Sequence, residues 1–330
     1  MKNQQVLLAR RPRGAVAEDD FRLVETEVPP VGEGQLLTRV HWLSLDPYMR
    51  GRMDESKSYA APQPLGEVMI GGTVAEVVES KNPRFSPGDF VVGMAGWQQF
   101  QLSDGGGLRK IDVSVIPASA YLGPVGMPGV TAWYGLTQIG KPAKGETVVV
   151  SAAAGAVGSV VGQLARIRGC RAVGIAGGRA KCDLVTSEYG FDACIDYKSE
   201  SFRADFKAAT ASGVDIVFEN VGGMALDASL ARMNPFGRIA LCGLIAGYSG
   251  QPIPIQNVRS LLVNRVLLQG FIVAEHMEAW PQALAELAQH VAAKRIHYRE
   301  TVAHGLSSAP RAFIGLLEGQ NVGKQLVKLV

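Results

Sequence analysis

A run of small residues near the middle of the chain has the spacing of a phosphate-binding turn. The apolar segment Val148–Val150 leads into S-A-A-A-G-A-V-G, and apolar residues at helical spacing follow. Within this run, Ala153, Gly155 and Gly158 form an A-x-G-x-x-G version of the dinucleotide fingerprint. Gly155 would let the backbone approach a pyrophosphate, and Gly158 would let a helix pack closely on a sheet. The candidate phosphate contacts are the backbone groups of Gly155, Ala156, Val157 and Gly158.

The glycine spacing alone is weak evidence, because small residues are common at helix starts. Its context is an apolar strand, a tight turn and then a helix, which favours a cofactor over close packing alone. The first turn of such a helix offers free N–H groups and the positive end of the helix dipole, and both suit a phosphate.

The residues after the next strand indicate which dinucleotide would bind. In an NAD site that strand ends in Asp or Glu, which accepts hydrogen bonds from the ribose hydroxyls. Here Arg171–Ala176 is followed by Gly177, Gly178, Arg179, Ala180 and Lys181, so two cations stand where an acid would serve NAD. The two cations could instead belong to a solvated helix face. The missing acid and the added charge together favour the 2′-phosphate of NADP(H) and argue against an S-adenosylmethionine methyltransferase.

The elements that would position these residues follow two patterns along the chain. Residues 1 to about 122 contain short strand candidates separated by proline and glycine, which is typical of a closed or nearly closed β-structure. These candidates are Val6–Arg10, Phe21–Thr26, Leu36–His41, Thr73–Glu79, Phe90–Met94 and Trp97–Leu102. From about Thr131, apolar strands alternate with helices, which predicts a parallel sheet covered on both faces. Its strand candidates are Thr147–Ser151, Arg171–Ala176, Ala193–Asp196, Asp215–Phe218 and Arg238–Cys242.

The C-terminal part of the chain adds one helix and one strand. Apolar spacing and a proline near the first turn predict a helix over Glu278–Lys294. The tail from Arg299 ends in a strand-like segment, Gln325–Val330. It has too little apolar material for a core of its own, so we expect it to return to the first domain.

Composition excludes several classes of protein. The 330 residues are 47% hydrophobic and 19% charged, which fits two packed domains, and a net charge of +3 provides no broad basic surface for nucleic acid. The uncharged stretch Thr147–Ala165 contains three glycines and is better interpreted as strand, turn and buried helix than as a membrane span. The four cysteines are scattered without a C-x-x-C pair, so we expect buried free thiols in a reducing, cytoplasmic compartment.

Five motifs, in order along the chain, resemble those of a known family. They are L-S-L-D-P-Y-M-R (43–50), G-M-P-G-V-T-A (126–132), A-A-A-G-A-V-G-S (152–159), E-N-V-G-G (219–223) and N-V-G-K (321–324). Together they resemble the zinc-free branch of the medium-chain dehydrogenase/reductase superfamily, in particular the prostaglandin reductases and alkenal/one oxidoreductases. The resemblance implies an α/β fold with a doubly wound Rossmann sheet and a GroES-like β-barrel domain. It implies a substrate domain of residues 1–122 and 299–330 and an NADPH-binding domain of residues 123–298.

The same resemblance suggests roles for single residues around NADP(H). Lys181 matches a lysine that holds the 2′-phosphate, and Tyr197 lies by the same phosphate. Asn220 and Tyr248 match residues on the ribose and pyrophosphate. The remaining matches lie near the nicotinamide or late in the chain, and they are Thr131, Phe271, Val273 and Asn321. Each also has a structural reading: Asn220 could cap a helix, and the tyrosines could be half-buried packing residues.

Neither zinc site of the superfamily's alcohol dehydrogenases can form in this sequence. The segment Pro64–Gly72 contains no histidine where the G-H-E ligand motif would lie, and the cysteine-rich structural loop is missing. Some of the closer relatives carry a tyrosine near the substrate about eight residues before the Phe-Ile-Val segment. Our count places Val263 there, which would remove one substrate hydrogen bond.

Without a metal, the easiest acceptor is a C=C bond conjugated to a carbonyl group. Its reduction places charge on the carbonyl oxygen, so the protein must offer hydrogen-bond donors. Tyr48 and Tyr59 are the candidate catalytic residues, although Tyr48 could be a barrel plug and Tyr59 an exposed loop residue. The expected activity is NADPH-dependent reduction of enones or enals. The alternatives are a quinone reductase of the same superfamily and a non-catalytic NADPH-binding redox sensor, and fold analogy makes a homodimer plausible.

Overall fold

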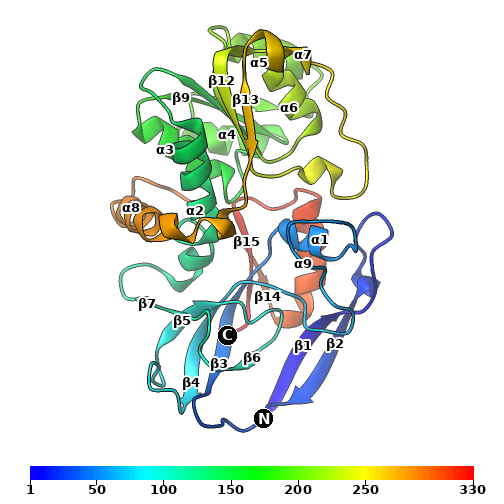
Figure 1. Cartoon of the computed structure of the whole chain (residues 1–330), viewed down its shortest axis with the longest axis vertical. Coiled ribbons are helices and arrows are strands. Elements are labelled where there is room, and N and C mark those ends of the chain that lie inside the picture. Colours follow the sequence, from blue (N-terminus) through cyan, green and yellow to red (C-terminus); the bar gives the residue numbers. More distant parts are fainter. The chain divides into compact units, whose positions relative to one another are not determined.

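The computed structural model describes residues 1–330, which form two compact units (Figure 1). The first unit combines Met1–Leu122 with Glu300–Val330, and the second is Gly123–Arg299. The sequence places the boundaries after residues 122 and 298, so the second boundary differs by one residue. The C-terminal tail lies in the same unit as the N-terminal strands.

The second unit is built on a six-stranded sheet in the order β10-β9-β8-β11-β12-β13. Every neighbouring pair is parallel. The strands are β8 (Thr147–Ser151), β9 (Arg171–Ala176), β10 (Ala193–Asp196), β11 (Val214–Glu219), β12 (Met233–Leu241) and β13 (Leu267–Gly270). Chain order reverses at β8, so the carboxyl ends of β8 and β11 flank the position where doubly wound sheets bind ligands.

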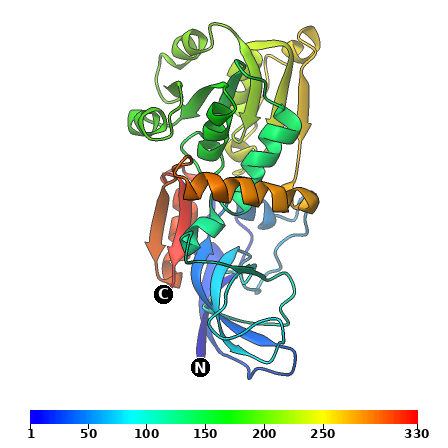
Figure 2. The ribbon, with the colours of Figure 1, turned by 90° about the vertical axis from the view of Figure 1, so that its left-hand side faces the viewer.

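Helices cover both faces of this sheet, as its apolar strands require (Figure 2). One face packs mainly against α2 (Met127–Tyr134), α3 (Gly158–Ile167), α4 (Arg179–Ser187) and α8 (Trp280–Ala292). The other packs against α5 (Phe202–Ala209) and α6 (Gly223–Leu230), and the short α7 (Arg259–Val263) precedes β13. The uncharged stretch Thr147–Ala165 forms β8, the turn after it and most of α3. The structure contains no helix of membrane-spanning length and hydropathy.

The first unit is a mostly antiparallel sheet domain. Its main sheet has the order β14-β15-β3-β4-β5-β7, with β6 also paired to β3, while β1 and β2 form a separate two-stranded sheet. The strands are β1 (Lys2–Leu8), β2 (Phe21–Glu27), β3 (Leu36–Ser44), β4 (Thr73–Ser80), β5 (Phe90–Gly93), β6 (Phe100–Ser103), β7 (Arg109–Ile111), β14 (Glu300–His304) and β15 (Lys324–Lys328). Its two helices are α1 (Tyr48–Arg52) and α9 (Ala309–Leu317).

Several predicted strands have different bounds in the structure. The predicted strand Trp97–Leu102 is wrong at its start, because Trp97 bonds through its backbone to Val6 and Met69 and only Phe100–Ser103 pairs with β3. The predicted strand Arg238–Cys242 begins five residues earlier, at Met233. That extension runs through Pro235, Phe236 and Gly237, residues that normally indicate a turn.

The predicted strands Thr147–Ser151, Arg171–Ala176 and Ala193–Asp196 have the bounds of β8, β9 and β10, and the remaining predicted elements are shifted at one or both ends. Val6–Arg10 is Lys2–Leu8, Glu278–Lys294 is Trp280–Ala292, and Gln325–Val330 is Lys324–Lys328. The strands β7, β13 and β14 were not predicted at all. The predicted fold class is nevertheless confirmed: a doubly wound parallel sheet is joined to a largely antiparallel sheet domain.

Candidate functional site

The small-residue turn after β8 is a tight loop shaped by its backbone. Ala152 has φ 51°, and Gly155 donates its N–H to the Ala152 carbonyl at 2.9 Å. A Cβ atom on Gly158 would lie 2.4 Å from the same carbonyl oxygen, so only glycine fits there. The helix α3 begins at this glycine. The turn and the helix can therefore approach each other only because of the residue type that the fingerprint requires.

This turn has the donors that a pyrophosphate needs. The N–H groups of Ala156, Val157 and Gly158 donate to no acceptor in the chain, since the first intrahelical bond of α3 is that of Ser159 to Gly155. Free N–H groups at the start of a helix bind anions well. The predicted backbone contacts of Gly155, Ala156, Val157 and Gly158 thus lie together in one turn, and the geometry fits a dinucleotide phosphate.

A buried polar network joins the ends of β8 and β11 beside this turn. The Ser151 hydroxyl donates to Glu219 Oε1 at 2.7 Å and accepts the N–H of Asn220 at 2.8 Å. The Asn220 amide donates to the Ser151 carbonyl at 2.7 Å. Glu219 Oε1 also accepts the N–H groups of Val221 and Gly222. The network fixes the backbone of Asn220 relative to the phosphate turn, and sequence reasoning assigned no role to Ser151 or Glu219.

Glu219 is 0% exposed, and its second oxygen, Oε2, has no hydrogen-bond partner. Burial raises the pKa of this carboxyl group, and the hydrogen bonds to Oε1 partly oppose that rise. A half-satisfied buried carboxyl costs stability. We interpret it as a group kept for positioning, because the donors that it does bind are the strand ends next to the candidate site.

The cationic end of the site lies around the start of α4 and the end of β10. The Tyr197 ring packs against Gly177, where a Cβ atom would lie 2.8 Å from the ring. Asp196 accepts the N–H groups of Gly178 and Lys198, at 2.7 and 2.9 Å, which fixes the two loops together. Gly177, Lys181 and Tyr197 are thus brought together as predicted from the sequence.

Lys181 is half-buried in this cluster. Burial, followed by the charge of Lys198, lowers the pKa of its amine. A bound anion reduces the repulsion between two positive charges that are held close together, and a phosphate group would be such an anion. Lys198 is therefore an addition to the candidate cation set; the sequence showed it next to Tyr197, without evidence that it faces Lys181.

Arg179 has different surroundings from Lys181. Its side chain is 88% exposed and forms an ion pair with Asp183, one turn later in α4, at 2.9 Å. This matches the alternative interpretation of a solvated helix face. Its predicted contact with a 2′-phosphate stays a prediction.

Three residues predicted near the nicotinamide use their side chains for packing or local bonds. Phe271 is 8% exposed and packs edge-to-face on Phe218 at 6.2 Å, inside the core of the second unit. Val273 is buried in the same core, and its carbonyl accepts the Trp280 indole N–H. The Thr131 hydroxyl donates to the carbonyl of Met127 within α2. Their contribution to a cofactor site would come from the backbone or from a change in side-chain conformation.

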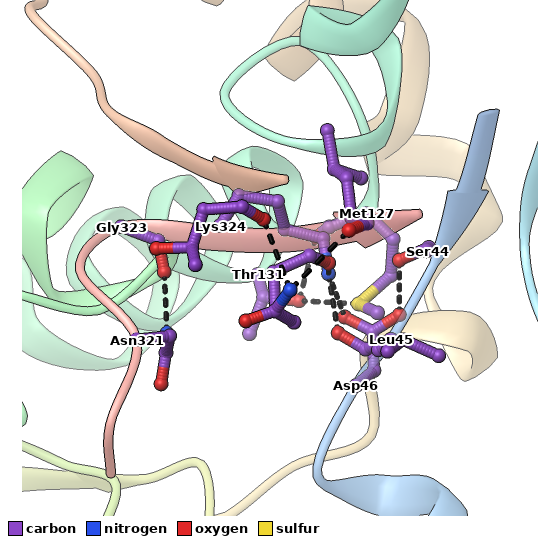
Figure 3. A network of polar contacts seen from close by, with 11 residues as sticks. Ser44, Leu45, Asp46, Met127, Thr131, Asn321, Gly323 and Lys324 are labelled. Atoms are coloured by element: carbon purple, nitrogen blue, oxygen red, sulfur yellow. Dashed lines mark hydrogen bonds and ion pairs between the residues drawn. The ribbon is translucent and has the colours of Figure 1, made fainter. Parts of the chain in front are cut away.

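The other predicted residues are more accessible. Tyr248 is half-buried after the short turn that follows β12, and a Cβ atom on Gly243 would lie 3.6 Å from its hydroxyl. Asn321, in the first unit, donates its side-chain amide to the Gly323 carbonyl at 2.7 Å (Figure 3). Val263, at the end of α7, is half exposed.

In the first unit, Tyr48 opens α1 and Tyr59 lies in the exposed loop that follows. Burial, then the charge of Asp46, raises the pKa of the Tyr48 hydroxyl, so this group keeps its proton at any working pH. Tyr59 contributes to the raised pKa of Tyr48, after burial and Asp46. The catalytic roles of the two tyrosines stay predictions.

A buried ion pair supports the segment that carries Tyr48 (Figure 3). Lys324 donates to the Leu45 carbonyl at 2.6 Å and to Asp46 Oδ1 at 2.9 Å. The Ser44 hydroxyl donates to the other Asp46 oxygen. Both charged groups are almost fully buried, and this pair binds β15 to the end of β3. Asp46 and Lys324 each belong to one of the five sequence motifs, but the contact between them was not predicted.

No group of three or more His, Cys, Asp or Glu side chains gathers where a metal ion could be held. The five histidines lie apart, and the cysteines are all free thiols.

Comparison with known proteins agrees with this geometry. Residues 4–111 match the family model described as the N-terminal domain of oxidoreductase, and residues 156–289 match the model described as zinc-binding dehydrogenase. An NADPH-dependent curcumin reductase of Escherichia coli is 44% identical, over 99% of this chain and 97% of that protein. An NADP(+)-dependent 2-alkenal reductase of Nicotiana tabacum is 41% identical over the same shares.

A prostaglandin reductase 1 of Rattus norvegicus is 40% identical, with 97% of each chain covered. Among solved structures, CurA of Vibrio vulnificus in complex with NADPH superposes with a TM-score of 0.95 and 43% identity, over 99% of both chains. A quinone oxidoreductase of Pseudomonas syringae, at 20% identity and a TM-score of 0.78, shares the fold. The chain therefore belongs to the zinc-independent medium-chain dehydrogenases/reductases, in the branch of the curcumin, alkenal and prostaglandin reductases.

Proposed function

We propose that this protein is an NADPH-dependent reductase of the C=C bond of α,β-unsaturated ketones or aldehydes, and that it leaves the carbonyl group intact. The observation that carries the proposal is the sheet edge of the second unit. There, the turn before α3 offers free N–H groups, the Lys181 cluster offers positive charge, and the end of β9 has no ribose-binding acid. Together these features suit a dinucleotide that carries a 2′-phosphate. The relatives named for curcumin, 2-alkenal and prostaglandin reduction support the substrate class.

The cofactor is NADP(H). We assign the pyrophosphate to the backbone of Gly155–Gly158 and the 2′-phosphate to Lys181, Tyr197 and Lys198. Asn220 would hold a ribose, because the Ser151 and Glu219 network fixes its backbone. Tyr248, Asn321 and the backbone around Thr131, Phe271 and Val273 complete the proposed set, and Gly177 makes room for the Tyr197 ring.

Bound NADPH supplies a hydride to the β-carbon of the substrate. The chain's own task is to stabilise the negative charge that develops on the carbonyl oxygen, and that requires a hydrogen-bond donor in place before the reaction. Tyr48 is the proposed donor, since its hydroxyl stays protonated and no hydrogen bond within the chain holds it. Tyr59, in the exposed loop that follows α1, is the second candidate.

Two alternatives share this cofactor site. The fold likeness to quinone oxidoreductases keeps a quinone acceptor open. A redox sensor that binds NADPH without turnover would need the same phosphate contacts but no proton donor. The presence of Tyr48 with a protonated, unbonded hydroxyl favours the catalytic reading.

An acceptor screen distinguishes the three functions. Oxidation of NADPH is followed with an enone, an enal, a quinone and a saturated aldehyde, each with and without a strong chelator. We expect turnover with the enone and the enal, none with the saturated aldehyde, and no effect of the chelator. Turnover with the quinone alone would replace the proposal with quinone reduction, and binding of NADPH without turnover would favour a sensor.

A further inference from the structure

Two of the four scattered cysteines meet in the second unit. Cys194 lies on β10, opposite Gly174 of β9 in the parallel register. A Cβ atom on Gly174 would lie 3.2 Å from the Cys194 sulfur and 3.1 Å from a methyl group of Val185. The Cys194 sulfur and the Val185 side chain therefore occupy neighbouring space above Gly174, on the face of the sheet that α4 covers.

Cys182 belongs to the same inner face of α4. It precedes Val185 by three residues, which places both side chains on one side of the helix. Both are buried, Cys182 with 5% of its surface exposed, and both belong to the core that Cys194 packs against. Each thiol is the largest influence on the pKa of the other, which agrees with this placement of the two side chains. Twelve positions apart in sequence, the two sulfurs thus lie close to each other in the α4–β10 layer.

We propose that Cys182 and Cys194 form a reversible oxidation site, at which hydrogen peroxide or an organic hydroperoxide closes a disulfide between α4 and β10. No other pair of cysteines in the chain shares such a placement. Cys170 bonds to the Ala143 carbonyl and Cys242 lies beside Glu219.

The chemistry needs one thiolate and one resolving thiol. The neighbouring Cys194 thiol lowers the pKa of Cys182, and burial of the Cys182 sulfur partly opposes this. The Cys182 thiolate attacks the peroxide oxygen, so the O–O bond breaks, a sulfenic acid forms and an alcohol or water leaves. The Cys194 sulfur then attacks Cys182, the S–S bond forms, and the hydroxyl group leaves as water with the Cys194 proton. Both thiols are oxidised, and one peroxide is reduced.

Closure of this bond would move the neighbouring cation cluster. A disulfide is about 2.05 Å long, much shorter than any non-bonded approach of two sulfurs, so α4 is drawn toward β10. Lys181 directly precedes Cys182, and Tyr197 follows Cys194 by three residues. This consequence rests on the proposed function: if these residues hold the 2′-phosphate, the oxidised protein binds NADPH more weakly, by about fivefold or more.

The sequence provides a direct chemical readout. Trypsin cuts after Lys181 and Lys198, and no other lysine or arginine lies between them, so both cysteines fall in one peptide, residues 182–198. The reduced full-length protein is treated with hydrogen peroxide, desalted, unfolded in N-ethylmaleimide and digested. We expect the peptide to be 2 Da lighter than its thiol form, without alkylation, and dithiothreitol to restore two alkylation sites. A peptide that stays fully alkylated, or that carries only sulfinic or sulfonic acid, overturns the proposal.

Matched variants separate the site from general oxidation. Cys182→Ser and Cys194→Ser should each abolish the 2 Da loss, whereas Cys170→Ser should leave it unchanged. The Kd for NADPH is then measured on reduced and oxidised wild-type protein by fluorescence. An equal Kd in both states overturns the link to the cofactor while the disulfide stands. Failure of the reduced protein to bind NADPH at all would instead refute the proposed function, and the mass readout would still decide on the thiol pair.

Discussion

Lys181 and Arg179 carry the same charge two residues apart, yet the structure gives them different surroundings. Lys181 is half-buried beside Lys198, while Arg179 is exposed and paired with Asp183. A charge-assisted hydrogen bond to phosphate contributes roughly 1.5–3 kcal/mol, so Lys181→Ala should weaken NADPH binding by about tenfold to a hundredfold. Binding of NADH, which has no 2′-phosphate, should barely change.

Arg179→Ala is the matched control for this prediction. Its ion pair with Asp183 lies in solvent, so its loss should change the Kd for NADPH by less than about threefold. Titration of both variants with both dinucleotides measures these effects. An unchanged NADPH affinity in Lys181→Ala would show that the cation cluster is a solvated surface and not a phosphate site.

Tyr48 is the residue on which the proposed chemistry depends. Loss of an oxyanion donor in other enzymes lowers the rate by about a hundredfold to a thousandfold, so Tyr48→Phe should lower kcat/KM by roughly tenfold to a thousandfold. The Kd for NADPH should stay within error of the wild type. The measurement pairs steady-state kinetics with a thermal melt. A variant that loses stability but keeps its kcat/KM would make Tyr48 a packing residue of the first unit.

At the scale of single residues, the sequence predicted where special residue types lie better than it predicted which side chains contact each other. The fingerprint glycines were predictable, because their need for close approach is a property of the residue type. The hydrogen bond of the Thr131 side chain and the core packing of Phe271 were not predictable, because both form only when the helix and the core have folded. Glu219 belongs to one of the five sequence motifs, but no role was predicted for it. Its partner Ser151 is 68 positions away, and nothing local indicates that the two meet.

Among the elements, the turn between β8 and α3 is the one most constrained by its glycines. A Cβ atom on Gly158 would meet backbone, 2.4 Å from the Ala152 oxygen, whereas one on Gly155 would lie 3.1 Å away. Gly158→Ala should therefore destabilise the fold by about 1–3 kcal/mol and also weaken NADPH binding, because the turn must shift. Gly155→Ala should weaken binding with a much smaller loss of stability, as its cost arises where the pyrophosphate approaches.

Thermal melts and NADPH titrations of the two variants test this contrast. Unchanged NADPH affinity in Gly155→Ala would remove the pyrophosphate from this turn. Stability equal to wild type in Gly158→Ala would show that α3 can move away from Ala152 without cost.

Strands buried in the parallel sheet were the elements best predicted from sequence. Thr147–Ser151, Arg171–Ala176 and Ala193–Asp196 have the predicted bounds, because apolar runs between turn residues leave little choice. β13 was missed, since its apolar run, Val266–Leu268, is short and ends in glutamine and glycine, and this edge strand is mostly exposed. The predicted range of β12 was too short, because the first residues of this strand include proline and glycine.

At the scale of the whole molecule, a long-range ion pair adds to the sheet pairing that joins the C-terminal tail to the first unit. Asp46 and Lys324 lie 278 positions apart and form a buried ion pair that binds β15 to the end of β3. The prediction that the tail returns came from its shortage of apolar residues, and the ion pair that holds it could not be predicted. The homodimer stays a prediction; the edge strand β13 and the exposed Leu262, at 80%, offer one surface for it.

The most direct test of the account is the product formed from a simple enone with NADPH deuterated at the transferred position. The proposed reaction sends the hydride to the β-carbon, with Tyr48 as the proposed donor to the carbonyl oxygen, so we expect the saturated ketone. Mass spectrometry and NMR should find one deuterium at the β-carbon and none at the carbonyl carbon. An allylic alcohol with deuterium on the former carbonyl carbon would contradict the proposed reduction of the C=C bond.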